Sequence, residues 1–320
     1  MKPNIFARTE LASAFEDCGF CLWDIGARGG TDPHFAPFGF AIDAVGFEPD
    51  PLAFEKLSSS GRWRSERFYE TALGGANTSL FLNIPKDPAG ASFLTHDTKI
   101  GARYGLQDLF QVEKVIDVRT ITIDWAVAEK QIPPPNMLKL DVEGLELDVL
   151  GGATEALKRV VAIKLEAAFM RHRVGQAVAG EIIAFLEGYG LYAVDMVDTA
   201  LWRTQPWAGD PYLVKAKPTY SRGRLAQADL IFLREPSVVT REMARSAALA
   251  AIGLGYFDHG LELFMVGAEE HAEDFYRAAH NASKTYGKAR ARQAIRENLS
   301  EVARLCRSLI TGLNIPKPTD

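Results

Sequence analysis

The sequence is poor in cysteine, with only three among its 320 residues. So few cysteines cannot form the disulfide framework that stabilises small secreted domains. Cys18 and Cys21 have redox-pair spacing, but such pairs follow a strand and open a helix in thioredoxin-like proteins, whereas this motif stands at the start of an apolar run at 20–25. No second Cys or His pair lies nearby to complete a zinc site. We therefore expect Cys21 to be a small core residue.

The sequence also lacks a surplus of basic residues and any long hydrophobic run. Lysine and arginine number 36 against 41 aspartates and glutamates, which gives a formal net charge of −5. Nucleic-acid-binding proteins usually carry a basic face, so we expect no nucleic-acid partner. No apolar run is long enough to cross a bilayer, and residues 1–8 have no apolar stretch of the signal-peptide type. The expectation is a cytoplasmic protein without a membrane span.

The sequence does contain a regular alternation of apolar runs and helical segments. The strand candidates are 20–25, 42–47, 68–73, 137–141, 160–166, 191–196 and 230–233. The helix candidates are 8–17, 51–59, 122–130, 144–157 and 178–188. This alternation is typical of βαβ units, and right-handed crossovers then build a mainly parallel, doubly wound sheet with helices on both faces.

Two irregular insertions interrupt this pattern. Residues 74–118 are rich in glycine and proline, with strand-like stretches at 79–83 and 112–118. Residues 198–228 carry the aromatics Trp202, Trp207 and Tyr212. Aromatic loops above a sheet often shape a substrate pocket, and the alternative is that these side chains fill a satellite core. We expect the insertions to determine which acceptor the protein takes.

The last part of the chain changes character. Residues 237–312 are rich in alanine, arginine and glutamate and are predicted to be helical, with one helix-turn-helix unit followed by an amphipathic helix at 288–311. We therefore divide the chain into a domain at 1–236 and a C-terminal helical extension at 237–320. The extension could pack on the sheet domain, join two copies of the chain or bind a peptide.

A glycine loop closes the first predicted strand at Asp24-Ile25-Gly26-Ala27. Glycine lets the backbone approach a ligand, and the following segment offers free backbone N–H groups. The loop lacks the Gly-x-Gly-x-x-Gly fingerprint of a nicotinamide site. An acid ahead of the glycine disfavours phosphate and favours a cationic ligand, such as the sulfonium of S-adenosylmethionine.

The next two strands end in further candidate cofactor contacts. Glu48 follows the second strand, where a carboxylate can accept both hydroxyls of a ribose, although it could instead cap the helix that starts near Pro49. Thr71 and Ala72 end the third strand, where strand order places an adenine ring. This combination predicts a cofactor that contains a nucleoside.

An acid-rich run follows the strand at 137–141. Lys139 and Asp141 share one face of that strand, and a buried lysine requires a partner. We expect Lys139 to pair with Glu166 on the next strand, Asp141 to face the cofactor, and Glu143 in the turn to act as general base or acceptor contact. The alternative is an acidic helix start, which would explain Glu143 and Glu146 but not Lys139 or Asp141.

Two histidines are further base candidates. His172 lies beyond the next strand, near the same edge of the sheet, and a histidine there could take a hydroxyl proton at neutral pH. His34 follows the first loop. The alternative for both is a solvated loop histidine.

Together these segments resemble the FkbM family of S-adenosylmethionine-dependent methyltransferases. The matching stretches are 24–27, 47–50, 72–74, 122–125, 138–146, 150–153, Glu166 and 187–192. The Lys-x-Asp-x-Glu-Gly-x-Glu run at 139–146 is the most specific of them. The resemblance covers about residues 20–235; the first loop departs from the family after Ala27, and the helical tail lies outside.

The resemblance implies a Rossmann-like, doubly wound, seven-stranded class I methyltransferase fold. It implies that Asp24, Gly26 and Ala27 lie near the methionine end of the cofactor, that Glu48 binds its ribose, and that Asp141 lies near the transferring methyl group. The activity implied is methyl transfer to a hydroxyl of a sugar, polysaccharide precursor or polyketide-type product.

Several functional hypotheses remain open at this point. The first is O-methylation of a sugar or glycan. The others are N-methylation or natural-product methylation, and a non-catalytic binding protein that uses its helical tail for a partner. Asp141, Glu143 and Glu166 would also suit magnesium, but the expectation is a reaction without a metal.

Overall fold

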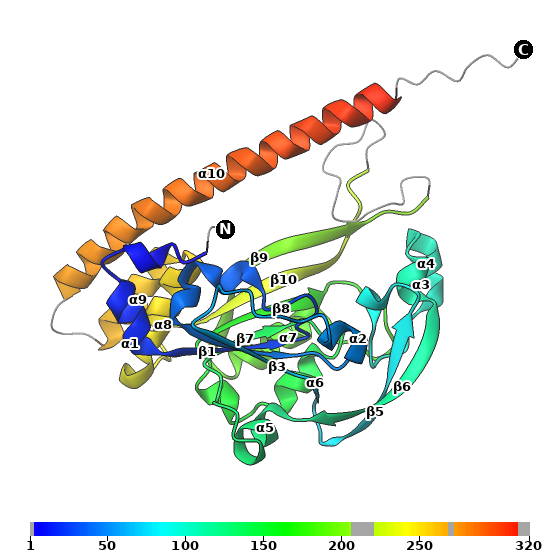
Figure 1. The fold of residues 1–320 in the computed structure, drawn as a ribbon, viewed down its shortest axis with the longest axis horizontal. Helices are drawn as coiled ribbons and strands as arrows, with labels where there is room; N and C mark the ends of the chain where they lie inside the picture. The colour runs from blue at the N-terminus through cyan, green and yellow to red at the C-terminus, as the bar shows by residue number, and fades with distance from the viewer. Residues whose placement is uncertain (1–2, 206–220, 268–271, 313–320) are drawn as a thin grey trace, which may run out of the picture.

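The computed structural model describes residues 3–205, 221–267 and 272–312, with side chains through residue 300. Within these residues, seven strands form one sheet in the order β3-β2-β1-β7-β8-β10-β9 (Figure 1). The strands are β1 (Phe20–Ile25), β2 (Ile42–Phe47), β3 (Ser65–Tyr69), β7 (Met137–Leu140), β8 (Ala162–Ala168), β9 (Leu191–Trp202) and β10 (Arg224–Arg234). Strand β10 is antiparallel to both of its neighbours, and the other pairs are parallel. The predicted doubly wound, Rossmann-like sheet is confirmed.

The sheet separates two hydrophobic cores because successive side chains of a strand point to opposite faces. On β1, Phe20 and Leu22 belong to one core, whereas Trp23 and Ile25 belong to the other. Helices α5 (Ile123–Glu129), α6 (Glu146–Gly151) and α7 (Ala179–Glu187) cover the Trp23 face. Cys21 is buried on that face and burial raises the pKa of its thiol to about 11, so the predicted core role is confirmed.

The Phe20 face is covered by helices from both ends of the chain. They are α1 (Ala12–Cys18), α8 (Arg241–Leu254) and α9 (Phe257–Gly267), with the 3-10 segments η1 (Phe6–Arg8) and η2 (Pro33–Ala41). The Phe6 ring packs at a tilt against Phe257 and Tyr286, with ring centroids 6.2 and 5.8 Å away. The predicted helical extension therefore shares a core with the sheet. The division of the chain at residue 236 stays a prediction.

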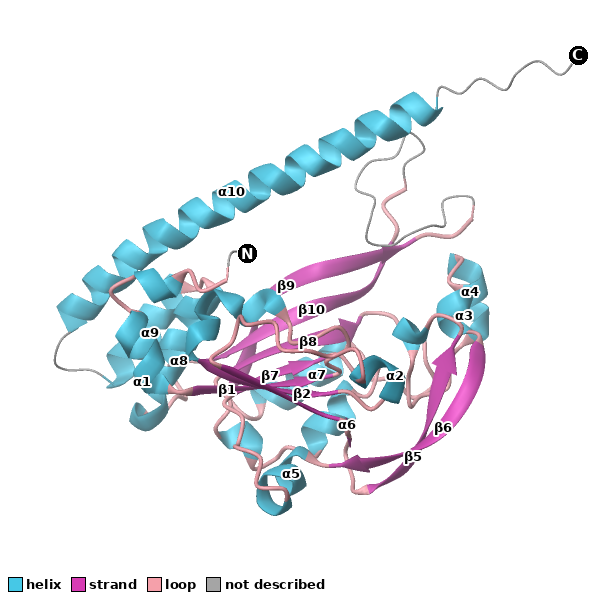
Figure 2. Cartoon of the chain, viewed as in Figure 1, coloured by secondary structure: helices cyan, strands magenta, loops and turns pink. Residues whose placement is uncertain are grey.

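The first insertion forms a small lobe at the edge of the molecule (Figure 2). Among the described residues it contains a three-stranded sheet of β4 (Ala72–Leu73), β6 (Val112–Ile121) and β5 (Thr78–Pro85), with α3 (Thr98–Tyr104) and α4 (Gln107–Phe110). The predicted strands at 79–83 and 112–118 are confirmed. The predicted strand at 68–73 is split, because β3 ends at Tyr69 and β4 joins this second sheet. Of the second insertion, Trp202 packs with the lobe, and Trp207 and Tyr212 lie outside the described residues.

The remaining elements are short except for the last helix. They are α2 (Pro51–Phe54), η3 (Pro88–Gly90), η4 (Ala156–Lys158) and α10 (Ala272–Gly312). Helix α10 begins sixteen residues before the predicted start at 288 (288 − 272), and its later turns leave the body of the molecule (Figure 1). None of the described helices combines the length and apolarity needed to cross a membrane.

Candidate active site

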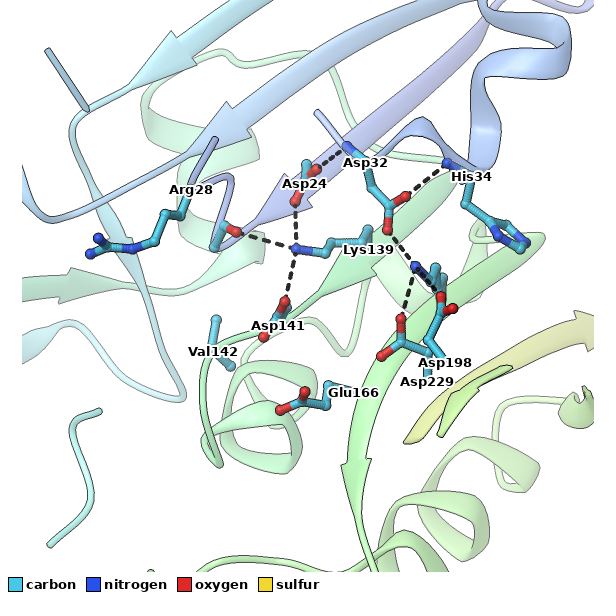
Figure 3. Close-up of polar contacts among 12 residues, drawn as sticks. Asp24, Arg28, Asp32, His34, Lys139, Asp141, Val142, Glu166, Asp198 and Asp229 are labelled. Atoms are coloured by element: carbon cyan, nitrogen blue, oxygen red, sulfur yellow. Dashed lines mark hydrogen bonds and ion pairs between the residues drawn. The ribbon is translucent and has the colours of Figure 1, made fainter. Parts of the chain in front are cut away.

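The Phe20 face of the sheet changes from apolar to polar along its strands. At the amino ends it carries core residues such as Leu22 and Met137. Toward the carboxyl ends the same face carries Asp24, Lys139, Lys164 and Asp229, which form a network (Figure 3). Ligands of open α/β sheets bind beyond these carboxyl ends.

Lys139 is the centre of the first part of this network. Its Nζ lies 3.2 Å from Asp24 Oδ1 and 3.5 Å from Asp141 Oδ2, and it donates a hydrogen bond to the Gly26 carbonyl at 3.2 Å. The predicted pair of Lys139 with Glu166 is wrong. The register sets Lys139 beside Lys164 on β8, whereas on β1 it sets Lys139 beside Asp24.

A second buried ion pair continues the network. Asp24 is fully buried, and its Oδ2 accepts a hydrogen bond from the backbone N–H of Asp32 at 2.7 Å. The Asp32 carboxylate is 2.6 Å from Lys164 Nζ, which is also 2.8 Å from Asp229. The chain of contacts Lys139–Asp24–Asp32–Lys164 thus fixes the loop after β1 to the sheet.

A cavity of about 310 Å³ opens above this network. Its lining includes six of the predicted site residues: Gly26, Glu48, Thr71, Ala72, Asp141 and Glu143. Asp24, Ala27 and His172 do not line it. The Asp24 carboxylate lies beneath the cavity, held by Lys139 and Asp32.

Gly26 shows why the first loop needs glycine. Its φ is +85°, and a Cβ there would overlap the carbonyl oxygen of Asp141. The two carboxyl ends of β1 and β7 can therefore approach each other only without a side chain at this position.

Glu48 projects into the cavity from the end of β2. Its Oε1 accepts the backbone N–H of Asp50 at 2.9 Å, and burial raises its pKa. The start of α2 is capped by Asp50, which accepts the Leu52 N–H at 3.0 Å, so Glu48 does not serve as the helix cap. Arg28, which sequence analysis did not single out, is 2.8 Å from Asp50 and borders the same cavity.

The turn after β7 is held in an unusual backbone conformation. Glu143 has φ +54°, which side-chain-bearing residues rarely adopt. Glu146 closes the turn, because its Oε1 accepts the N–H groups of Val142 and Gly144, both at 3.1 Å. Ser92 from the inserted lobe donates to the Glu143 carbonyl at 2.7 Å. Glu146 is also the first residue of α6, as predicted.

The Glu143 carboxylate forms an ion pair with Arg173, another residue that sequence analysis missed. Arg173 Nη1 lies 2.7 Å from Nε2 of His172, and Nδ1 of His172 lies 2.9 Å from the Met170 carbonyl. Because Arg173 only donates and a carbonyl only accepts, the proton of His172 is on Nδ1. Burial lowers the pKa of His172 to about 3, so the histidine is neither solvated nor free to take a proton through Nε2.

His172 instead lines a smaller adjoining cavity of about 240 Å³. Trp202 and Phe110 form its aromatic side, and their ring centroids are 5.0 and 6.0 Å from that of His172. Glu143 and Gln227 line both cavities.

Three carboxylates converge on the shared wall. Oxygen atoms of Asp141, Glu143 and Glu166 lie within 4.8 Å of one another, and oxygen donors suit magnesium. Each carboxylate also has a protein partner, because Lys139 contacts Asp141, Arg173 contacts Glu143, and Gln227 donates to Glu166. Burial, followed by the neighbouring carboxylates, holds the pKa of Glu166 well above its usual range.

Comparison with known proteins gives consistent matches. A sequence model of the methyltransferase FkbM domain matches residues 24–191. A 145-residue stretch is 29% identical to hexuronic acid methyltransferase AglP of Haloferax volcanii, over 45% of this chain and 54% of that protein. The chain thus matches about half the length of this curated relative.

Two solved structures are also similar to the chain. One is methyltransferase FkbM of Methylobacillus flagellatus, with 14% identity and a TM-score of 0.34 over 67% of this chain and 44% of that one. The other is a TehB-like methyltransferase of Corynebacterium glutamicum, with 10% identity and a TM-score of 0.28 over 71% of this chain and 89% of that one.

Proposed function

Since this chain belongs to the FkbM methyltransferase family, we propose that it transfers the methyl group of S-adenosylmethionine to a hydroxyl oxygen of a sugar or polysaccharide precursor. The observation that carries the proposal is the position of Glu143. It lies between a cavity lined by the predicted cofactor residues and a second cavity with an aromatic wall.

The larger cavity is proposed to hold the cofactor. Glu48 has one carboxylate oxygen on the Asp50 N–H and would use the other for the ribose hydroxyls. Thr71 and Ala72 would contact the adenine, and Gly26 lets the methionine end approach the backbone. Asp141 would lie near the transferring methyl group. Asp24 would act through Lys139, since its own carboxylate lies below the cavity wall.

Methyl transfer requires that the acceptor oxygen be aligned with the methyl group and that the hydroxyl proton be removed. S-adenosylmethionine supplies a methyl group already activated by a positive sulfur. With this cofactor bound, the methyl group would pass from the sulfur to the acceptor oxygen and leave S-adenosylhomocysteine, while a carboxylate of this chain would take the hydroxyl proton. We propose Glu143 as that base. Arg173 fixes its side chain and Ser92 fixes its backbone, and a general base must be held in position to take a proton.

The smaller cavity is proposed to hold the acceptor sugar. Trp202 and Phe110, which are 6% and 3% exposed, contribute the apolar part of its wall, and Glu143 and Gln227 offer polar groups beside them. A sugar ring combines apolar faces with hydroxyls at its rim, so it matches this wall. The curated relative named as a hexuronic acid methyltransferase supports the same acceptor class.

Calorimetric titration with S-adenosylhomocysteine tests the cofactor half of the proposal. The expected result is saturable binding of one molecule per chain, and folded protein that gives no binding would overturn it. Incubation with S-adenosylmethionine and separate sugar, amine and lipid acceptors tests the other half by the mass gain of one methyl group. Methylation only of an amine or a natural product would favour the alternative enzyme functions. Cofactor binding without turnover on any acceptor would favour a binding protein.

A further inference from the structure

A second large cavity lies between strand β9 and helix α10, on the Phe20 face of the sheet. We call it the β9–α10 cavity. It has a volume of about 520 Å³ and shares no lining residue with the 310 Å³ cavity of the candidate active site. Its size falls within the range of about 300–1,000 Å³ that is common for ligand pockets. Much of its wall comes from the helical extension, beyond the segment that matches the family.

Two tyrosines of this wall are held in place by hydrogen bonds. Tyr256 donates its hydroxyl proton to Asp195 on β9 at 2.9 Å, and Tyr286 on α10 donates to the Leu254 carbonyl at 3.0 Å. Gly255 makes room for the second ring, because a Cβ there would come within 2.6 Å of the Tyr286 hydroxyl oxygen. The two rings are therefore positioned before any ligand arrives.

The cavity offers more hydrogen-bond acceptors than donors. Both tyrosine hydroxyls have committed their protons, so they present only lone pairs to a ligand. Gln293 donates through its amide nitrogen to Glu297 at 2.7 Å, and its Oε1 is buried with no partner among the described residues. A buried acceptor without a donor is unfavourable, and a rotation of the Gln293 side chain, which lines the cavity, would turn Oε1 to a hydroxyl group of a ligand there.

The charge of the wall excludes an anion. Its carboxylates are those of Asp32, Asp195, Asp198 and Glu297, and its basic side chains are those of Lys164 and Arg290. The ring of His34 also borders the cavity, and burial lowers its pKa, which favours the uncharged form. The formal balance is therefore −2 (2 − 4). Lys164 is already engaged by Asp32 and Asp229, whereas Arg290 remains as a donor that would repel an ammonium group. An uncharged molecule with many hydroxyls and an apolar face for a tyrosine ring fits best.

The β9–α10 cavity and the active-site cavity lie on either side of one chain of ion pairs and a backbone hydrogen bond. Asp32 and Lys164 line the first, Lys139 lines the second, and Asp24 connects Asp32 with Lys139. Figure 3 shows the contacts of Asp24 with both Asp32 and Lys139.

We propose that the β9–α10 cavity binds an uncharged glycosyl unit, as an additional subsite for a glycan acceptor. The glycan part of this inference rests on the proposed function, whereas sugar binding in the cavity can be measured without methyl transfer. The full chain is needed, because the wall combines β9 with the C-terminal helices.

Fluorine NMR of protein labelled with 3-fluorotyrosine measures this binding. The signals of Tyr256, Tyr286 and Tyr276 are assigned by single Tyr→Phe variants. Titration with neutral disaccharides of different linkage is expected to shift the Tyr256 and Tyr286 signals saturably. Tyr276 lies on α10 away from the cavity and is 59% exposed, so its signal should stay constant. Absence of a selective shift would overturn the proposal, as would tighter binding of glucuronic acid or spermidine than of every disaccharide.

Two substitutions of amide side chains on α10 test whether disaccharides bind in the β9–α10 cavity. Gln293→Leu removes the buried acceptor and should weaken disaccharide binding about tenfold. Asn298→Leu makes the same type of change at an exposed position of the same helix and should leave binding unchanged. Equal effects of the two variants on disaccharide binding would overturn the proposed binding site.

Calorimetry with S-adenosylhomocysteine on the same sample separates the two proposals. Cofactor binding without a disaccharide shift would reject the subsite alone. A disaccharide shift without cofactor binding would retain the sugar site and reject the methyl-transfer function proposed above.

Discussion

Asp24 and Lys139 occupy paired positions on neighbouring parallel strands, and the lysine ammonium lies 3.2 Å from a carboxylate that is fully buried. The pair joins the two strand ends that border the candidate cofactor cavity. Burial favours the neutral form of Asp24, whereas Lys139 favours its charged form. The stability of this region therefore depends on both partners being present.

Removing the lysine should destabilise the fold. Lys139→Met leaves Asp24 buried without its cation, and breaking one side of such a pair costs about 3–5 kcal/mol. Urea unfolding at neutral pH measures the loss. The double variant Asp24→Asn, Lys139→Met should recover part of it. Lys158→Met is the control, since its ion pair with Glu155 is exposed and should contribute under about 1 kcal/mol. Equal losses for the two lysines would contradict the role of the buried pair.

Glu48 should affect cofactor binding more than stability. Glu48→Gln keeps an oxygen for the Asp50 N–H but removes the charge offered to the ribose. We expect the Kd for S-adenosylhomocysteine to rise about 10–100-fold, as for loss of charge-assisted hydrogen bonds. Calorimetry measures this, with Glu55→Gln on the exposed end of α2 as the control. An unchanged Kd would remove Glu48 from the cofactor site.

Glu146 should make the protein less stable as pH rises. Burial raises its pKa from 4.5 to about 7, so the folded state holds this proton more tightly than the unfolded state. The free energy of unfolding contributed by this group should therefore fall between about pH 4.5 and pH 7, by about 3 kcal/mol. Glu146→Gln keeps an oxygen for Val142 and Gly144 and should reduce this pH dependence. Urea unfolding at pH 5 and pH 8 measures it. The same slope in wild type and variant would refute the assignment, and exposed Glu155→Gln serves as control.

Arg173 should matter for turnover because it holds the proposed base. Arg173→Met frees the Glu143 side chain, and misplacement of a catalytic group can lower kcat by about 100-fold. Binding of S-adenosylhomocysteine should change little, since Arg173 does not line the cofactor cavity. Arg171→Met is the matched control, as its pair with Glu181 is exposed. Parallel loss of cofactor binding and turnover would indicate general damage to the fold instead.

A chelator distinguishes a carboxylate cluster that is neutralised by protein side chains from one that holds a magnesium ion. If Lys139, Arg173 and Gln227 suffice as partners, protein dialysed against EDTA should keep its activity, and added magnesium should not raise it. Loss of activity that magnesium restores would assign a cation to Asp141, Glu143 and Glu166.

The sequence predicted the strands better than their pairing. The runs 20–25 and 42–47 match β1 and β2, because strands buried on both faces are continuously apolar. The strand at 230–233 was placed correctly but is longer, since Gln227 and Asp229 interrupt the apolar pattern of β10. The partner of Lys139 was missed because register depends on which strand lies beside it, and Asp24 on β1 is 115 residues earlier in the sequence (139 − 24).

The sequence predicted only part of the site, because some of its residues follow strands directly and others are placed by tertiary contacts. Gly26, Glu48, Asp141 and Glu143 follow strands directly, and strand ends meet at one edge of a sheet. Arg173 and the Gln227 side chain gain their roles only through tertiary contacts. The sequence signal that could have indicated Gln227 was a glutamine within an otherwise apolar strand. The roles proposed for these residues stay predictions.

The contacts of Phe6 with Phe257 and Tyr286 have a consequence for synthesis of the chain. These two aromatic partners of Phe6 come 251 and 280 residues later in the sequence (257 − 6 and 286 − 6). That layer of the Phe20 face can close only after Tyr286 has left the ribosome, and until then Phe6, Phe15 and Phe20 lack part of their cover. Before that point the exposed apolar side chains favour association of the nascent chain with other molecules.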